Sequence, residues 1–244
     1  MAKGDADGMK AAAKRVYDKV TVRARTASEF IVLLDGRELK TPAKKVLAMP
    51  THALATGVAL EWEAQDRHIR PATMPLMKLA TTTVDQVPSI RPTMVDSMLR
   101  CLESDLVCFR TVDEPALLKK EEAAFSPLIQ WAADELALPL TVSEDLGLTH
   151  PPGAMPRAKQ LLAEADDWEL AALDQITGTS KSLVLALALA RGQVDSAEAV
   201  SVARVAEQHQ VDEWGEVEAG HDLDAADLAV RIGSGSTFLR LLGR

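Results

Sequence analysis

Hydrophobic and polar residues alternate near the start of the chain, which predicts β-strands. In residues 20–24 apolar side chains alternate with threonine and arginine, as in a strand with one buried face. A second apolar run covers residues 30–34, and Asp35-Gly36 supplies the pair that a tight hairpin turn with positive φ angles favours. We therefore predict a hairpin whose returning strand covers residues 37–41.

Helical spacing replaces this alternation after Pro50. Thr51 is a candidate N-cap for a helix that ends near Gln65, because apolar residues follow it at intervals of four. Residues 69–75 are predicted to be extended, Arg91-Pro92 to open a helix, and residues 106–110 to form a lone strand that returns to the sheet. Further helices are expected at 76–84, 114–124, 126–138, 154–166, 168–191, 195–213 and 224–242. Within them, the apolar run 183–190 is interpreted as buried helix because leucine and alanine favour helices.

These patterns predict an α+β protein. Residues 1–14 are expected to be a flexible N-terminus, residues 15–112 a β-rich N-terminal domain, and residues 113–244 a helical domain. The length of 244 residues is ample for a buried core, and 47% apolar with 26% charged residues is ordinary globular composition. No apolar stretch approaches the roughly 18 residues that a membrane span needs, so membrane insertion is not expected.

Charge is divided unevenly along the chain. The formal net charge is −9, which gives nucleic acid no general attraction and makes it a poor partner. Residues 1–50 nevertheless hold 11 lysines and arginines against 6 acids, whereas residues 192–230 hold ten acids against the single base Arg204. Such a concentration of like charge is expected to serve capping, solvation or a partner.

The acidic segment 212–227 is the main candidate for a functional surface. It contains Glu213, Glu216, Glu218 and Asp222, and no calcium-loop or His-Glu-x-x-His pattern accompanies them. Three interpretations stay open: a solvated face, a docking surface for a protein partner, and a metal site of a hydrolase that also uses His221. Trp214 is expected to be a packing anchor at a helix end, and stacking on a ligand is the alternative.

Two other segments were candidates for binding. Residues 233–237, Gly-Ser-Gly-Ser-Thr, resemble a phosphate-binding loop but lack the lysine that reaches the phosphates, so no nucleotide is predicted. Because no metal-binding pattern was found in the acidic segment, no metal or other cofactor is expected, and the metal site there is only the alternative. Met74 and Met77 flank Pro75-Leu76; they are expected in the core, and the functional alternative is an adaptable apolar contact surface.

Four short motifs occur in an order that resembles one known family. They are LDGRELKTP (34–42), EWEAQ (61–65), MPL (74–76) and WGEVEAGHDLD (214–224). A fifth segment, DLVCFR (105–110), is similar to the family's Asp-Leu-x-x-Tyr-Arg, with Phe109 in place of tyrosine. The family is the assembly chaperone of the ATP synthase catalytic head that acts on its α subunit, typified by the mitochondrial assembly factor 2.

The resemblance implies a β-rich N-terminal domain followed by a C-terminal orthogonal α-helical bundle. It also implies a non-enzymatic function, in which the protein binds the unassembled α subunit and prevents its aggregation until it pairs with the β subunit. The first ten residues lack the features of a transit peptide, which favours a cytoplasmic bacterial representative, whereas eukaryotic relatives would act in the mitochondrial matrix. The expected partner-binding residues are Glu213, Trp214, Glu216, Glu218 and Asp222, with Met74 and Met77 as the apolar alternative.

Overall fold

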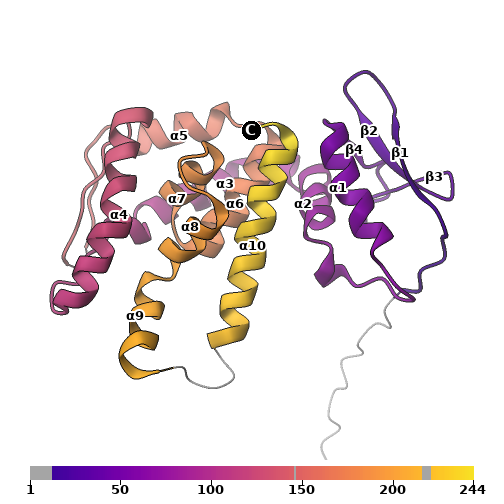
Figure 1. The fold of residues 1–244 in the computed structure, drawn as a ribbon. Coiled ribbons are helices and arrows are strands. Elements are labelled where there is room, and N and C mark those ends of the chain that lie inside the picture. The colour runs from indigo at the N-terminus through magenta and orange to yellow at the C-terminus, as the bar shows by residue number, and fades with distance from the viewer. Residues whose placement is uncertain (1–12, 146, 216–220) are drawn as a thin grey trace, which may run out of the picture.

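The fold combines a small sheet at one end with a larger group of helices (Figure 1). The structure is a computed structural model that describes residues 13–145, 147–215 and 221–244. The predicted flexible segment 1–14 therefore lies outside the described residues, except for its last two positions. The predicted α+β class is confirmed.

The sheet is antiparallel and is built around the predicted hairpin. Its strands are β1 (Val20–Ala24), β2 (Phe30–Leu34), β3 (Arg37–Glu38) and β4 (Ala48–Met49), in the order β1-β2-β3, with β4 also paired to β2. Asp35 and Gly36 have φ angles of 47° and 79°, which confirms the turn. The returning strand is shorter than the predicted 37–41, because the chain turns at Pro42 and only a single bridge, from Lys40 to Val46, continues the pairing.

Helix α1 (His52–Glu63) covers one face of this sheet, as Figure 1 shows. The predicted N-cap is confirmed, since the hydroxyl of Thr51 accepts a hydrogen bond from the Leu54 backbone N–H at 3.1 Å. The same hydroxyl donates to the Leu241 carbonyl at 2.6 Å, near the other end of the chain. The start of α1 therefore ties the sheet to the C-terminal helix.

The central part of the chain departs from prediction in two places. A 3-10 turn, η1 (Pro71–Thr73), interrupts the segment predicted to be extended and precedes α2 (Pro75–Asp85). Helix α3 (Val87–Leu102) starts four residues before the predicted Arg91-Pro92, and Pro92 lies inside it on an exposed face, where solvent can reach the carbonyl that proline leaves without a helical donor.

The lone strand predicted at 106–110 is wrong. Residues Leu106–Cys108 form a 3-10 turn, η2, because the buried Asp105 side chain caps the turn by accepting from the Val107 N–H at 3.2 Å. Phe109 makes one parallel bridge, to Ser143, and does not reach the N-terminal sheet.

The remaining helices differ from prediction mainly in where one helix ends and the next begins. The two helices expected at 114–124 and 126–138 are one, α4 (Pro115–Leu136), with Pro127 inside it. The helix expected at 168–191 is two, because Lys181 takes a left-handed φ of 59° between them, and the one expected at 195–213 breaks at Arg204. The elements are α5 (Ala154–Glu164), α6 (Asp167–Ser180), α7 (Leu183–Ala190), α8 (Ser196–Ala203), α9 (Val205–Trp214) and α10 (His221–Leu242).

The core extends through both parts of the molecule. All residues of α7 are buried, which confirms the interpretation of 183–190 as buried helix. Helices α2 and α3 pack against α6, and α1 and α2 also pack against α10. The proposed boundary between residues 112 and 113 therefore follows three helices, α1, α2 and α3, that contact the C-terminal part, and it stays a prediction. Among the described residues, no helix is both long and apolar enough to cross a membrane.

One of the two glycines in segment 233–237 is needed for helix packing. Both lie inside α10, and a Cβ on Gly235 would lie 2.7 Å from Cγ1 of Ile176 on α6, whereas a Cβ on Gly233 would have nothing within 4 Å. Gly235 thus allows α10 and α6 to approach closely.

A matched pair of substitutions tests this packing. Gly235→Ala should destabilise the protein by about 1–3 kcal/mol through overpacking. Gly233→Ala should stabilise it by about 0.5–1 kcal/mol, because alanine favours the helix and the site is open. Thermal unfolding of both variants measures the difference, and equal melting temperatures would show that α10 and α6 do not approach as described.

Candidate functional site

Helix α9 presents the described end of the acidic segment to solvent. The helix packs against α4, where the buried ring of His209 lies 3.3 Å from Lys120 Nζ, and Lys120 also bonds the Asp212 carboxylate at 2.7 Å. Its C-terminus carries Glu213, which is exposed, and Trp214, whose exposed fraction is 74%. The expectation that Trp214 is a packing anchor is therefore wrong.

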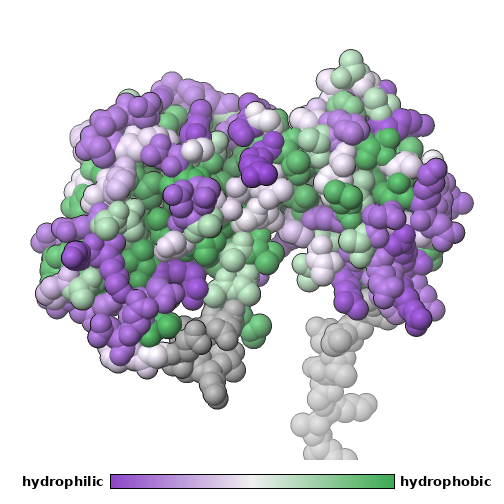
Figure 2. Space-filling view, in the orientation of Figure 1, coloured by the Kyte–Doolittle hydropathy of each residue, from purple (hydrophilic) through white to green (hydrophobic). Residues whose placement is uncertain are grey.

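The first half of α10 presents a second exposed apolar group. Leu223 is 72% and Val230 is 53% exposed, and with the exposed Ala226 they follow at intervals of three and four on one face of the helix. Asp224 and Asp227 are exposed beside them. Figure 2 shows hydrophobic surface on the lower part of both helices, on either side of the residues drawn in grey. We call Glu213, Trp214, Leu223, Asp224, Ala226, Asp227 and Val230 the α9–α10 surface.

Apolar side chains that are exposed as a contiguous patch mark sites of protein contact, whereas apolar side chains exposed singly are ordinary. A large apolar side chain with carboxylates around it suits a partner that offers an apolar patch with basic residues at its rim. The α9–α10 surface thus has the composition of a protein-binding site.

The other residues predicted for partner binding divide into two groups. Glu216 and Glu218 lie outside the described residues, as does the side chain of Asp222, although Asp222 belongs to α10. Met74 is only 3% exposed and packs in the core, where it cannot contact a partner, and Met77 is half-buried against the same core. Of the predicted partner-binding residues, the structure thus describes the surroundings of Glu213, Trp214, Met74 and Met77 alone.

A groove of about 420 Å³ continues from the α9–α10 surface between α10 and α2. Val230 lies at its edge, and small residues line the α10 side, so that the groove is shallow and weakly polar. Its lining residues are Glu61, Pro75, Leu76, Ser196, Ala229, Val230, Gly233, Ser234 and Thr237. The sequence alone indicates no joint role for Glu61 and Val230, because only the packing of α10 against α1 and α2 brings them to one groove.

Glu61 is the one carboxylate in the lining of this groove. Its two oxygens accept hydrogen bonds of 2.7 Å from the backbone N–H groups of Leu76 and Met77, at the start of α2. Burial raises the pKa of Glu61 to about 7 despite these two bonds. The carboxylate replaces a side-chain cap that Met74 cannot provide, so its first role is to hold α2 against α1.

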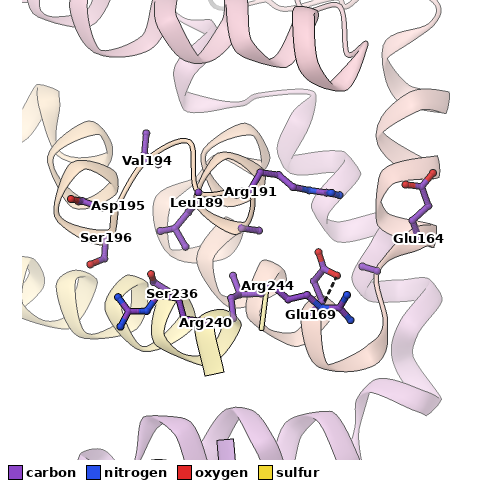
Figure 3. Close-up of a pocket in the computed structure, with 14 residues that line it drawn as sticks. Glu164, Glu169, Leu189, Arg191, Val194, Asp195, Ser196, Ser236, Arg240 and Arg244 are labelled. Carbon is purple, nitrogen blue, oxygen red and sulfur yellow. Dashed lines mark ion pairs between the residues drawn. The ribbon is translucent and has the colours of Figure 1, made fainter. Parts of the chain in front are cut away.

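A second pocket, of about 700 Å³, lies at the C-terminal end of α10 (Figure 3). Three arginines and three acids line it, so its formal charges balance. Arg244 lies 3.9 Å from Glu169 and also pairs with Asp166, while Asp195 caps α8. These charged side chains pair with one another or cap a helix, and we assign no ligand to this pocket.

The structure tests the metal-site interpretation only in part. Within residues 13–145, 147–215 and 221–244, no three His, Cys, Asp or Glu side chains group closely enough to hold a metal ion. The side chain of His221, which that interpretation needs, lies outside the described residues.

Comparison with known proteins identifies the family. A family model described as ATP12 chaperone protein matches residues 14–133. The crystal structure of Atp12 from Paracoccus denitrificans superposes with a TM-score of 0.88 at 30% sequence identity, covering 94% of this chain and 98% of that one. The Atu1473 protein of Agrobacterium tumefaciens gives a TM-score of 0.87 at 32% identity, over 94% of this chain and 86% of that one.

A curated relative agrees with these matches. The mitochondrial protein atp12 of Schizosaccharomyces pombe is 25% identical over 93% of this chain and 83% of its own length. The resemblance seen in the five sequence motifs is thereby confirmed for nearly the whole length of the chain. The protein belongs to the ATP12 chaperone family, whose role is the assembly of ATP synthase.

Proposed function

We propose that this chaperone binds the unassembled α subunit of the ATP synthase catalytic head through the α9–α10 surface, and that it does so without catalysing a reaction. The observation that carries the proposal is the exposure of Trp214 and Leu223, at 74% and 72%, beside exposed carboxylates. A free ring subunit exposes the apolar surface meant for its neighbour, which would otherwise aggregate. Temporary cover by a surface of this composition would prevent that aggregation until the β subunit binds.

The experiment measures how well the protein suppresses aggregation of purified α subunit. Trp214→Ser combined with Leu223→Ser should raise the concentration needed for protection by on the order of tenfold or more, since buried tryptophans dominate interface energies. The matched control is Val112→Ser combined with Val142→Ser, which removes two other exposed apolar side chains, of 40% and 42% exposure. Equal protection by both double variants would refute the proposal.

Charge reversal separates the acidic contribution from the apolar one. Glu216→Lys with Glu218→Lys should slow association at low salt and matter less at moderate salt, because rim charges act mainly on the association rate. The melting temperature of this variant should equal that of the parent. If protection is unchanged at both salt concentrations, the acids are only a solvated face and the apolar residues act alone.

We propose the bacterial cytoplasm as the site of action. The bacterial relatives are 30–32% identical to this chain, whereas the mitochondrial atp12 of Schizosaccharomyces pombe is 25% identical. The alternative of a metal-assisted hydrolase that uses residues 212–227 is tested by metal analysis of protein purified without added metal, where a stoichiometric ion would favour it.

A further inference from the structure

Strand β1 has one edge that no other strand covers. It pairs with β2 along its whole length and is the first strand in the order β1-β2-β3. The backbone N–H of Asp35 donates to the Lys19 carbonyl at 2.9 Å, and that of Arg25 donates to the Glu29 carbonyl at 2.7 Å. These bonds fix which residues of β1 face β2, namely the odd-numbered ones.

The even-numbered residues of β1 therefore direct their backbone N–H and C=O groups to the free edge. They are Val20, Val22 and Ala24, and within the part of the chain that the structure describes nothing bonds these groups. An exposed edge of this kind is a ready template for a further strand.

A groove lies between this edge and α1. It has a volume of about 300 Å³ and is lined on one side by the consecutive residues 18–22. The other side is one face of α1, with Thr56, Ala59, Leu60 and Glu63. Leu60 is 63% exposed, and Val20 and Val22 are half-buried, so with Ala59 they form an aliphatic strip in a groove whose other lining residues are polar or charged. A strand edge beside a helix is an arrangement that receives extended peptides as added strands.

The basic residues within β1 and at its two ends determine which peptide it would bind. Lys19, Arg23 and Arg25 are exposed. Two of them form ion pairs at the protein surface, Arg23 with Glu38 at 3.2 Å and Arg25 with Glu29 at 3.7 Å. An added strand would place alternate side chains toward Leu60 and toward this basic face. The acids Asp18 and Glu63 also line the groove, and the guanidinium of Arg15 bonds the backbone carbonyls of both.

We propose that the free edge of β1 is a second binding site, which takes an extended polypeptide segment of alternating apolar and acidic residues as an added strand. The apolar residues lie in the groove against Leu60, and the acidic ones lie beside Lys19 and Arg23. The site is independent of the α9–α10 surface, which lies on other elements of the fold (Figure 1).

The test uses the full chain and a fluorescent peptide of sequence EVEVEVE as probe. Its matched counterpart, KVKVKVK, has the same strand pattern with the opposite charge. Anisotropy should show saturable binding of the acidic peptide, and binding of the basic one at least about tenfold weaker. Hydrogen exchange should show new protection of the Val22 and Ala24 amides on addition of the acidic peptide. Failure of the acidic peptide to bind, or equal binding of both, would overturn the proposal.

Two variants of the protein locate the binding. Val22→Pro removes an N–H that faces the free edge and takes no part in the β1–β2 ladder. The variant should therefore bind the acidic peptide about tenfold more weakly while the sheet persists. Leu60→Ser should weaken peptide binding to a similar degree and leaves the backbone of β1 unchanged. This second variant provides the test if the proline variant fails to fold. Val142→Ser is the control for loss of an exposed apolar side chain. Unchanged affinity in a folded Val22→Pro variant and in Leu60→Ser would place the peptide elsewhere and refute the site.

Discussion

Replacing Asp105 by alanine should lower the free energy of unfolding by about 3–5 kcal/mol, because it leaves several buried backbone donors without an acceptor. The Asp105 side chain is fully buried and accepts from the N–H groups of Leu183 at 2.7 Å, Val184 at 3.1 Å and Val107 at 3.2 Å. Two of these donors begin α7, which is buried throughout, so water cannot replace the carboxylate. Urea unfolding of the variant measures the loss.

The matched control is Asp195→Ala. Asp195 also caps a helix, α8, with a capping box that includes Glu198, but it is exposed to solvent. Its loss should cost about 1 kcal/mol, since water can satisfy the freed N–H groups. If the two alanine variants lose the same stability, burial is not what makes Asp105 important.

The elements that local signals specify were predicted well. The hairpin depends on Asp35-Gly36 and on the alternation in 20–24, and the start of α1 depends on Thr51, all of which act within a few residues. The breaks in the C-terminal helices were missed because Lys181 and Arg204 are ordinary helix formers. Their conformation is set by packing, with Ser182 capping α7 and α9 turning toward α4.

The structural roles of the family-motif residues could not be predicted from the sequence, for a different reason. Asp105 contacts Leu183, 78 positions away, and Arg110 at the other end of the same motif is buried, donating to the carbonyls of Val107 and Phe109. Gln65 bonds the Arg70 backbone N–H and the Thr73 hydroxyl. These polar side chains hold the fold together, which no pattern in a single sequence reveals, because their partners are set by tertiary contacts.

The candidate site was predicted from charge but not from apolar exposure. The acids of 212–227 are visible as a run in the sequence, whereas Trp214, Leu223 and Val230 look like core residues there. They are exposed because α9 packs mainly against α4 and because the first half of α10 extends beyond the helices that cover its second half. Exposure of this kind follows from helix placement and from no property of the residue itself.

Glu61→Gln should change how stability depends on pH. Burial raises the pKa of Glu61 from its usual 4.5 to about 7, so the fold prefers the protonated acid. The stabilising contribution of that group is complete below pH 4.5 and is lost as the pH rises through 7. Between pH 5 and pH 8 the variant should therefore gain about 2 kcal/mol relative to the parent, after allowance for partial solvent access.

The comparison must rest on the change with pH, because glutamine alters the two bonds to Leu76 and Met77 by a constant amount. Glu63→Gln, on an exposed position of the same helix, is the control and should leave the pH profile of the parent unchanged.

The same measurement on the complex with the α subunit tests whether the client reaches the groove. If a basic side chain of the client enters the groove beside Val230, it stabilises the Glu61 carboxylate, and the pH dependence of the complex should flatten toward that of the glutamine variant. A profile that is equally steep with and without the α subunit would show that no basic side chain of the α subunit enters the groove.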